Sequence, residues 1–210
     1  MQCKSVAERN IPPFYKIWDI VQFKEKWSDI LNREMWKERK GGRSDIEIFE
    51  SVELRAKAIY DRISSILSSF FEKGETVDVF RSISVEDTGK FIDDVVKSGK
   101  SYHEGVLQGV GIFWAWDIES AVSYRGGYRD EVILEAAANC EDVDFEGTII
   151  AFLMFSEGSC DPNENENELR LKKGRKMPLR SVYKGTEGGK TKEALEPNRI
   201  TFSTPVWVWT

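Results

Sequence analysis

Apolar residues recur at helical spacing through the first third of the chain. They stand three and four positions apart from residue 14 to about residue 36, and a cleaner stripe of the same spacing covers residues 49–70. Ser44 and Glu47 form a capping-box pattern just before the second stripe, and Gly74 is a natural C-cap after it. These patterns predict two long helices.

After the second stripe the pattern changes to short apolar runs, which polar and glycine-rich segments separate. Short helices are expected over residues 91–96 and after Asp117, which can cap one. Polar loops are expected over residues 156–167 and 185–197. The runs that predict strands cover residues 76–83, 111–116, 131–138, 148–155, 168–171, 177–183 and 199–209. Helices followed by many short strands predict an α+β fold rather than a parallel α/β sheet.

The size and composition fit a globular protein with a real core. The 210 residues are 40% hydrophobic and 31% charged, which excludes wholesale disorder. We expect a helical N-terminal region over residues 1–74 and a strand-rich core over residues 75–210, in one compact unit. No apolar run approaches the roughly 18 residues of a membrane helix, and the N-terminus lacks the apolar block of a signal peptide. We therefore expect no membrane partner.

Charge and reactive residues narrow the chemistry further. The net charge of −6 argues against broad nucleic-acid binding, although a local basic patch is compatible with it. Three scattered cysteines predict neither a disulfide framework nor a zinc site, which fits a reduced, cytoplasmic setting. The single histidine, His103, excludes a His-rich metal site and argues against Ser-His-Asp catalysis.

Arg81 stands inside an apolar strand run, between Phe80 and Ser82. An arginine there is costly unless it is paired, so two interpretations remain open. In one, the strand lies at an edge and the guanidinium reaches water. In the other, the guanidinium is fixed toward an anion, because its planar fork matches a phosphate.

The run from Gly111 to Asp117 is rich in aromatic residues, and Tyr124 follows it. It is either an aromatic core strand with a capped helix or a set of flat apolar walls for a planar ring.

Glu166 and Glu168 stand two residues apart at the predicted start of a strand. They are either part of a solvated acidic loop or a pair that faces one space, because residues two apart in extended chain share a side. Paired carboxylates suit glycosidic chemistry, in which a positive oxocarbenium-like centre develops.

In this order, the three features resemble the arginine–serine–glutamate clade of mono-ADP-ribosyltransferases. Members carry an arginine on the first core strand, a Ser-Thr-Ser motif on a middle strand and a Glu-x-Glu before a later strand. Here Arg81 precedes the Gly111 strand, and Glu166-x-Glu168 leads into an apolar strand and the Gly174 turn. With the stretch 144–150, this ending is similar to small phage and bacterial members. The resemblance covers residues 76–183, and it implies a core of two packed, mainly antiparallel sheets.

One motif departs from the family. The place of Ser-Thr-Ser is taken by residues 113–116, and Thr201-Phe202-Ser203-Thr204 comes after the glutamates, in the wrong order. The histidine clade does not match, since Arg81 already fills the first-strand position.

The resemblance implies that NAD is the substrate and assigns a role to each site residue. Arg81, with Ser82 beside it, would hold the pyrophosphate or the adenylate-side ribose. Glu168 would stabilise the ribosyl cation as nicotinamide leaves, and Glu166 would orient or deprotonate the acceptor. The aromatic residues expected to flank nicotinamide are Trp114, Trp116 and Tyr124.

The function implied is transfer of ADP-ribose from NAD to a side chain of a target protein, with arginine as the acceptor that Glu-x-Glu favours. Such small enzymes are typically toxins or phage effectors, which act in the cytoplasm of the host cell. The chain's acidity favours a protein acceptor over nucleic acid. Two alternatives stay open: an NAD glycohydrolase, and a catalytically dead scaffold that inhibits a partner by binding it.

Overall fold

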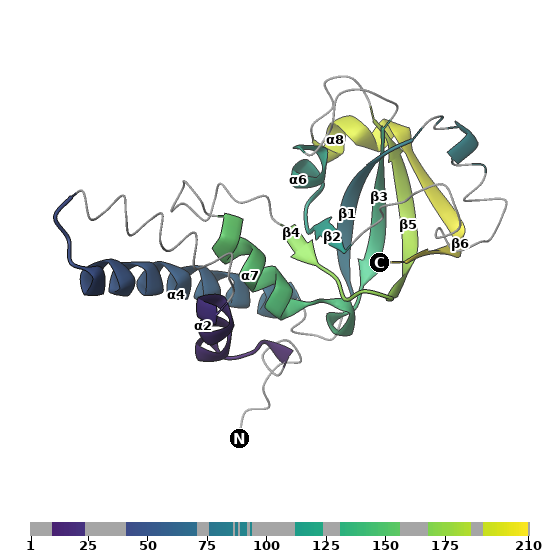
Figure 1. The fold of residues 1–210 in the computed structure, drawn as a ribbon. Helices are drawn as coiled ribbons and strands as arrows, with labels where there is room; N and C mark the ends of the chain where they lie inside the picture. Colours follow the sequence, from purple (N-terminus) through teal and green to yellow (C-terminus); the bar gives the residue numbers. More distant parts are fainter. Residues whose placement is uncertain are drawn as a thin grey trace. The chain divides into compact units, whose positions relative to one another are not determined.

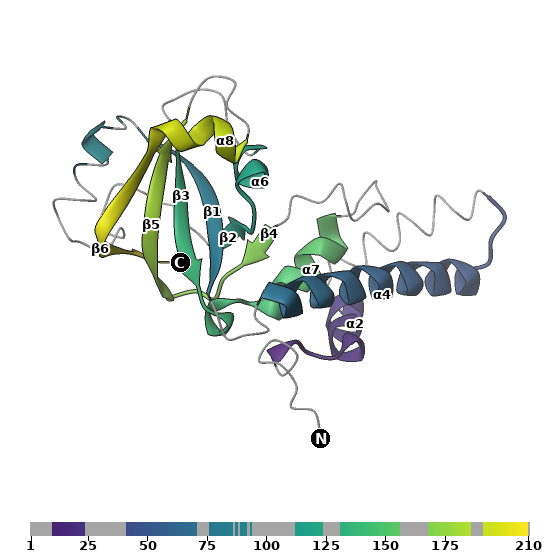
Figure 2. The same ribbon diagram turned by 180° about the vertical axis from the view of Figure 1, so that it is seen from behind.

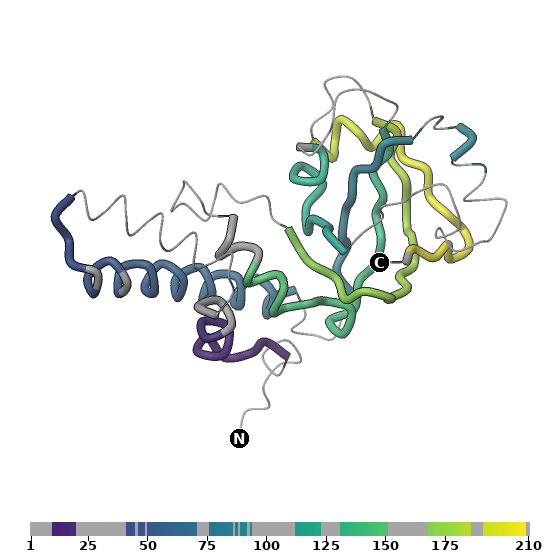
Figure 3. Tube along the Cα trace, in the orientation of Figure 1, coloured from purple at the N-terminus to yellow at the C-terminus, as the bar shows by residue number. Residues whose placement is uncertain are grey.

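The computed structural model of the chain describes residues 10–23, 41–70, 76–85, 87, 89–91, 93, 112–123, 131–155, 168–185 and 191–209. The chain divides into two compact units (Figure 1), and Figure 3 follows the trace through both. One unit comprises Met1–Lys73 and Phe145–Asn165, and the other comprises Gly74–Asp144 and Glu166–Thr210.

The first unit is helical and contains α2 (Phe14–Phe23), α4 (Asp45–Phe70) and α7 (Phe145–Phe155). Both predicted N-terminal helices are therefore present, while residues 24–36 and Gly74 lie outside the described ranges. The capping box is confirmed, because the Ser44 amide donates to Glu47 Oε2 at 2.8 Å and the Glu47 amide donates to Ser44 Oγ at 3.4 Å. The buried face of α4 repeats at three and four residues: Ile48, Val52, Ala56, Ile59, Ile63 and Leu67.

The α7 helix corrects one prediction, since residues 148–155 were expected to form a strand and are helical instead. The segment is apolar on every side, so its pattern has neither the period of a strand nor that of an amphipathic helix. It contacts α2 and α4, which explains its uniform hydrophobicity. α7 thus groups with the N-terminal helices, whereas the sequence assigns all of residues 75–210 to the strand-rich core.

The second unit is built on a six-stranded sheet with the strand order β4-β2-β1-β3-β5-β6. Every pairing in it is antiparallel, so the predicted α+β class with mainly antiparallel strands is confirmed. The described strands form this one sheet, and the two packed sheets that the resemblance implies stay a prediction. The strands are β1 (Val77–Ser84), β2 (Phe113–Ala115), β3 (Glu131–Ala138), β4 (Glu168–Arg170), β5 (Lys176–Lys184) and β6 (Arg199–Trp209).

Two short helices, α6 (Ile118–Ser123) and α8 (Lys192–Leu195), lie beside each other against the sheet (Figures 1 and 2). Asp117 caps α6 as predicted, because its carboxylate accepts from the Ser120 amide at 2.7 Å. Part of the expected loop 185–197 is helical instead, since Thr191 caps α8 and the 3-10 turn η2 (Glu196–Asn198) follows. The core beneath comprises Phe80, Ala115, Ile118, Ala121, Val122, Ile133, Tyr183 and Leu195. None of the helices in the described ranges is long and apolar enough to cross a membrane.

Candidate functional site

The sheet register brings the arginine strand and the glutamate strand to either side of β2. Phe80 of β1 pairs with Ala115 of β2, and Ala115 pairs with Glu168, the first residue of β4. Arg81 is the next residue along β1. Arg81 and Glu168, which are far apart in the sequence, therefore lie within one residue of the same cross-strand row. Because neighbouring strand residues alternate faces, the Arg81 side chain leaves β1 on the face opposite to that of Glu168.

Arg81 is half-buried in an interior strand, because β1 lies between β2 and β3. The interpretation of an edge-strand arginine with its head in water is therefore wrong. Its guanidinium donates a hydrogen bond to the carbonyl oxygen of Phe113. β1 and β2 are joined at a single residue pair, so this contact ties the two strands where their ladder is short.

The charge of Glu168 acts on the Arg81 guanidinium. Burial lowers the pKa of Arg81, and the nearby Glu168 carboxylate opposes that shift. An opposite charge nearby stabilises a buried cation, so Glu168 favours the charged form of Arg81.

Glu168 lies at the edge of the sheet and is held by a second arginine. Its Oε1 is 3.2 Å from Nε of Arg170, two residues further along β4 and on the same face. The two side chains are 17% and 23% exposed, so the carboxylate is largely covered but not sealed. A carboxylate held in this way is a group that can stabilise a developing positive charge.

The aromatic residues of the second motif divide between the core and the surface. Trp114 is 2% exposed and belongs to the core, whereas Trp116, just after β2, is half-buried. Only Trp116 of the two presents surface that a ligand could contact in this conformation. Ser82 is half-buried beside Arg81, while Glu166 and Tyr124 lie outside the described residues.

Phe113 and Arg170 are residues of this site that the sequence analysis did not select. They are direct partners across β2 and β4, and the Arg170 guanidinium carbon lies 4.8 Å from the centroid of the Phe113 ring. Phe113 is 42% exposed, unlike the tryptophan that follows it. The alternation of strand residues carries the signal, since the face of Glu168 includes Phe113 and not Trp114.

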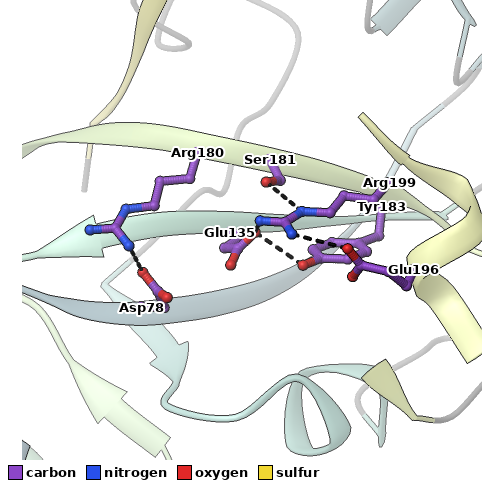
Figure 4. A network of polar contacts seen from close by, with 7 residues as sticks. All are labelled: Asp78, Glu135, Arg180, Ser181, Tyr183, Glu196 and Arg199. Atoms are coloured by element: carbon purple, nitrogen blue, oxygen red, sulfur yellow. Dashed lines mark hydrogen bonds and ion pairs between the residues drawn. The ribbon is translucent and has the colours of Figure 1, made fainter. Parts of the chain in front are cut away.

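A second polar cluster lies further along the same row of the sheet (Figure 4), where Glu135 is only 2% exposed. Its Oε2 accepts from Tyr183 Oη at 3.0 Å and from Arg199 Nη2 at 2.9 Å. Arg199 also donates to Ser181 Oγ at 2.9 Å and to Glu196 Oε1 at 3.1 Å. Burial, with Glu135 beside it, raises the pKa of Tyr183. The phenol therefore stays protonated as a donor, and the cluster is satisfied within itself.

Residues 201–204, which resemble the Ser-Thr-Ser motif in composition, do not take its place in the described sheet. Residues 201–204 belong to β6, which is the edge strand opposite β4. Four strands separate them from Glu168 in the sheet order, so they cannot support its carboxylate. Arg170 is the side chain that contacts Glu168 instead.

No protein-family model, curated protein or solved structure matches the chain. Among the described residues, no group of three His, Cys, Asp or Glu side chains lies close enough to hold a metal ion.

Proposed function

We propose that the protein is an NAD-dependent mono-ADP-ribosyltransferase, which transfers ADP-ribose to a side chain of a target protein and releases nicotinamide. The observation that supports this most is that the sheet brings Arg81 on β1 and Glu168 on β4 to either side of β2, within electrostatic reach of each other. A guanidinium for a diphosphate beside a carboxylate for a sugar cation is what cleavage of a nucleotide glycoside needs.

The proposed reaction assigns each group one step. Arg81, with Ser82 beside it, binds the diphosphate or the adenylate-side ribose, and Trp116 lies against the nicotinamide. The bond between ribose C1′ and the nicotinamide nitrogen breaks, and its electron pair stays with nicotinamide. Glu168 stabilises the positive charge that remains on the ribose. The acceptor then donates an electron pair to C1′, and Glu166 takes its proton.

Arg170 supports Glu168 in place of the missing Ser-Thr-Ser motif, which has this role in the family. Its guanidinium is 3.2 Å from the carboxylate, and it is fixed over the Phe113 ring. This contact holds the rotamer of Glu168 before the substrate binds. The departure from the family motif is therefore compatible with activity.

The proposal is tested by incubating the purified protein with isotope-labelled NAD and a bacterial lysate, followed by mass spectrometry of the labelled proteins. The expected result is one or a few proteins that carry ADP-ribose, and no label with Glu168→Gln as the matched control. Free ADP-ribose without labelled protein would show that the activity is NAD hydrolysis rather than transfer. Intact NAD after prolonged incubation would overturn the enzymatic proposal and leave the binding scaffold.

A further inference from the structure

Phe113, Arg170 and Glu168 form a stack on two strands at one edge of the sheet. The ring of Phe113 faces the Arg170 guanidinium at 4.8 Å, and that guanidinium reaches Glu168 Oε1 at 3.2 Å. The register explains the contact, because Phe113 and Arg170 are cross-strand partners and Glu168 is the diagonal neighbour.

An aromatic face beside a carboxylate is a recognition site for a planar cation. The ring attracts the cation through its quadrupole, and the carboxylate supplies the opposite charge and a hydrogen-bond acceptor. In the structure, a side chain of the protein itself, Arg170, satisfies both groups. Phe113 is 42% exposed, more than any other large apolar side chain of the described sheet unit.

We propose that the Phe113 ring and the Glu168 carboxylate bind a planar organic cation, and that Arg170 occupies this position until the ligand displaces it. The natural ligand would be the positively charged nicotinamide ring of NAD, with Phe113 in the place that the proposed function gives to Trp116. This identification rests on the proposed function. The cation site itself rests only on the geometry of the three side chains.

Displacement has a measurable consequence. When a ligand must first displace an internal group, its apparent affinity is the intrinsic affinity multiplied by the fraction of molecules in which the site is open. Removal of the Arg170 guanidinium takes away the competitor and a like charge, and both changes favour an incoming cation. A neutral ring of the same shape gains much less, since it neither competes for the carboxylate nor responds to the charge.

The test is titration with 1-methylnicotinamide, a planar cation, against neutral nicotinamide, by calorimetry or by NMR of the aromatic side chains. Arg170→Thr should bind the cation about tenfold more tightly than the wild type, as expected for loss of one competing cation–π contact, and should bind nicotinamide with little change. Arg170→Lys keeps the charge but not the planar group, so its affinity for the cation should lie between those of the wild type and Arg170→Thr.

Phe113→Leu supplies the second variant, with Arg170 in place. It should weaken binding of 1-methylnicotinamide in parallel with the loss of the ring, and its exposed position makes the substitution compatible with folding. Equal or weaker binding of the cation by Arg170→Thr would overturn the inference, as would unchanged binding by Phe113→Leu. Because the titration requires no turnover, a wild type that binds the cation but leaves NAD intact would overturn the proposed function alone.

Discussion

The Glu135–Arg199 pair should respond asymmetrically to removal of either partner. Arg199→Met leaves a carboxylate that is 2% exposed and keeps only the neutral Tyr183 hydroxyl as a partner in the network. Glu135→Gln leaves a guanidinium that is 29% exposed and still bonded to Glu196 at 3.1 Å and to Ser181 at 2.9 Å. The residue that remains behind decides the cost, because an unpaired buried charge is expensive and a half-exposed, hydrogen-bonded one is not.

The magnitudes follow from this difference. Arg199→Met should lower the free energy of unfolding by about 3–5 kcal/mol, as expected when the more exposed partner of a buried pair is removed and the buried charge remains. Glu135→Gln should cost only about 1–2 kcal/mol, because the amide oxygen still accepts from Tyr183 and Arg199. The double variant should cost less than the sum, with a coupling of about 1–3 kcal/mol, since it leaves no charge behind.

Urea unfolding by circular dichroism measures these costs, and hydrogen exchange on peptides from β3 and β5 assigns them to the sheet unit. Tyr183→Phe is the matched control, because it removes one neutral donor and leaves the ion pair in place. An equal or larger loss for Glu135→Gln than for Arg199→Met would refute the argument from exposure.

Three further variants test other parts of the molecule. Arg81→Ala should weaken NAD binding in calorimetry and also lower the melting temperature without ligand, because its half-buried guanidinium binds the Phe113 carbonyl; unchanged NAD affinity would remove it from the site. Glu166→Gln should impair transfer to protein more than nicotinamide release, and equal losses would contradict an acceptor role. Burial raises the pKa of Asp78, with Arg180 opposing and Glu135 adding to the shift, so the folded state holds the proton more tightly. The wild type should therefore gain stability over Asp78→Asn as the pH falls from about 7 to about 4, and thermal melts that show a constant difference would refute this.

The sequence predicts the elements with local signals and misses what depends on long-range pairing. The Ser44–Glu47 box and the Asp117 cap form because each needs only residues three positions away. The strand with Arg81 follows from its apolar run. The helix α7 was predicted as a strand because an apolar segment without periodicity does not separate the two.

The candidate site shows the same limit. Trp114 is predicted as an aromatic wall for nicotinamide, yet the register turns it into the core and presents Phe113 beside Arg170. No local pattern states that β2 pairs with β4, so the face that Glu168 shares could not be deduced. The spacing of two residues is compatible with a contact of Arg170 with Glu168. The importance of that contact depends on the Phe113 ring, which comes from the neighbouring strand.

The rate of nicotinamide release from NAD by the purified protein and by Glu168→Gln tests the central claim most directly. The substitution keeps the shape of the side chain and removes the charge that would stabilise the ribosyl cation. We predict a measurable rate for the wild type and a loss on the order of a hundredfold or more for the variant, with unchanged circular dichroism. Equal rates for the two proteins, or no release by the wild type, would contradict it.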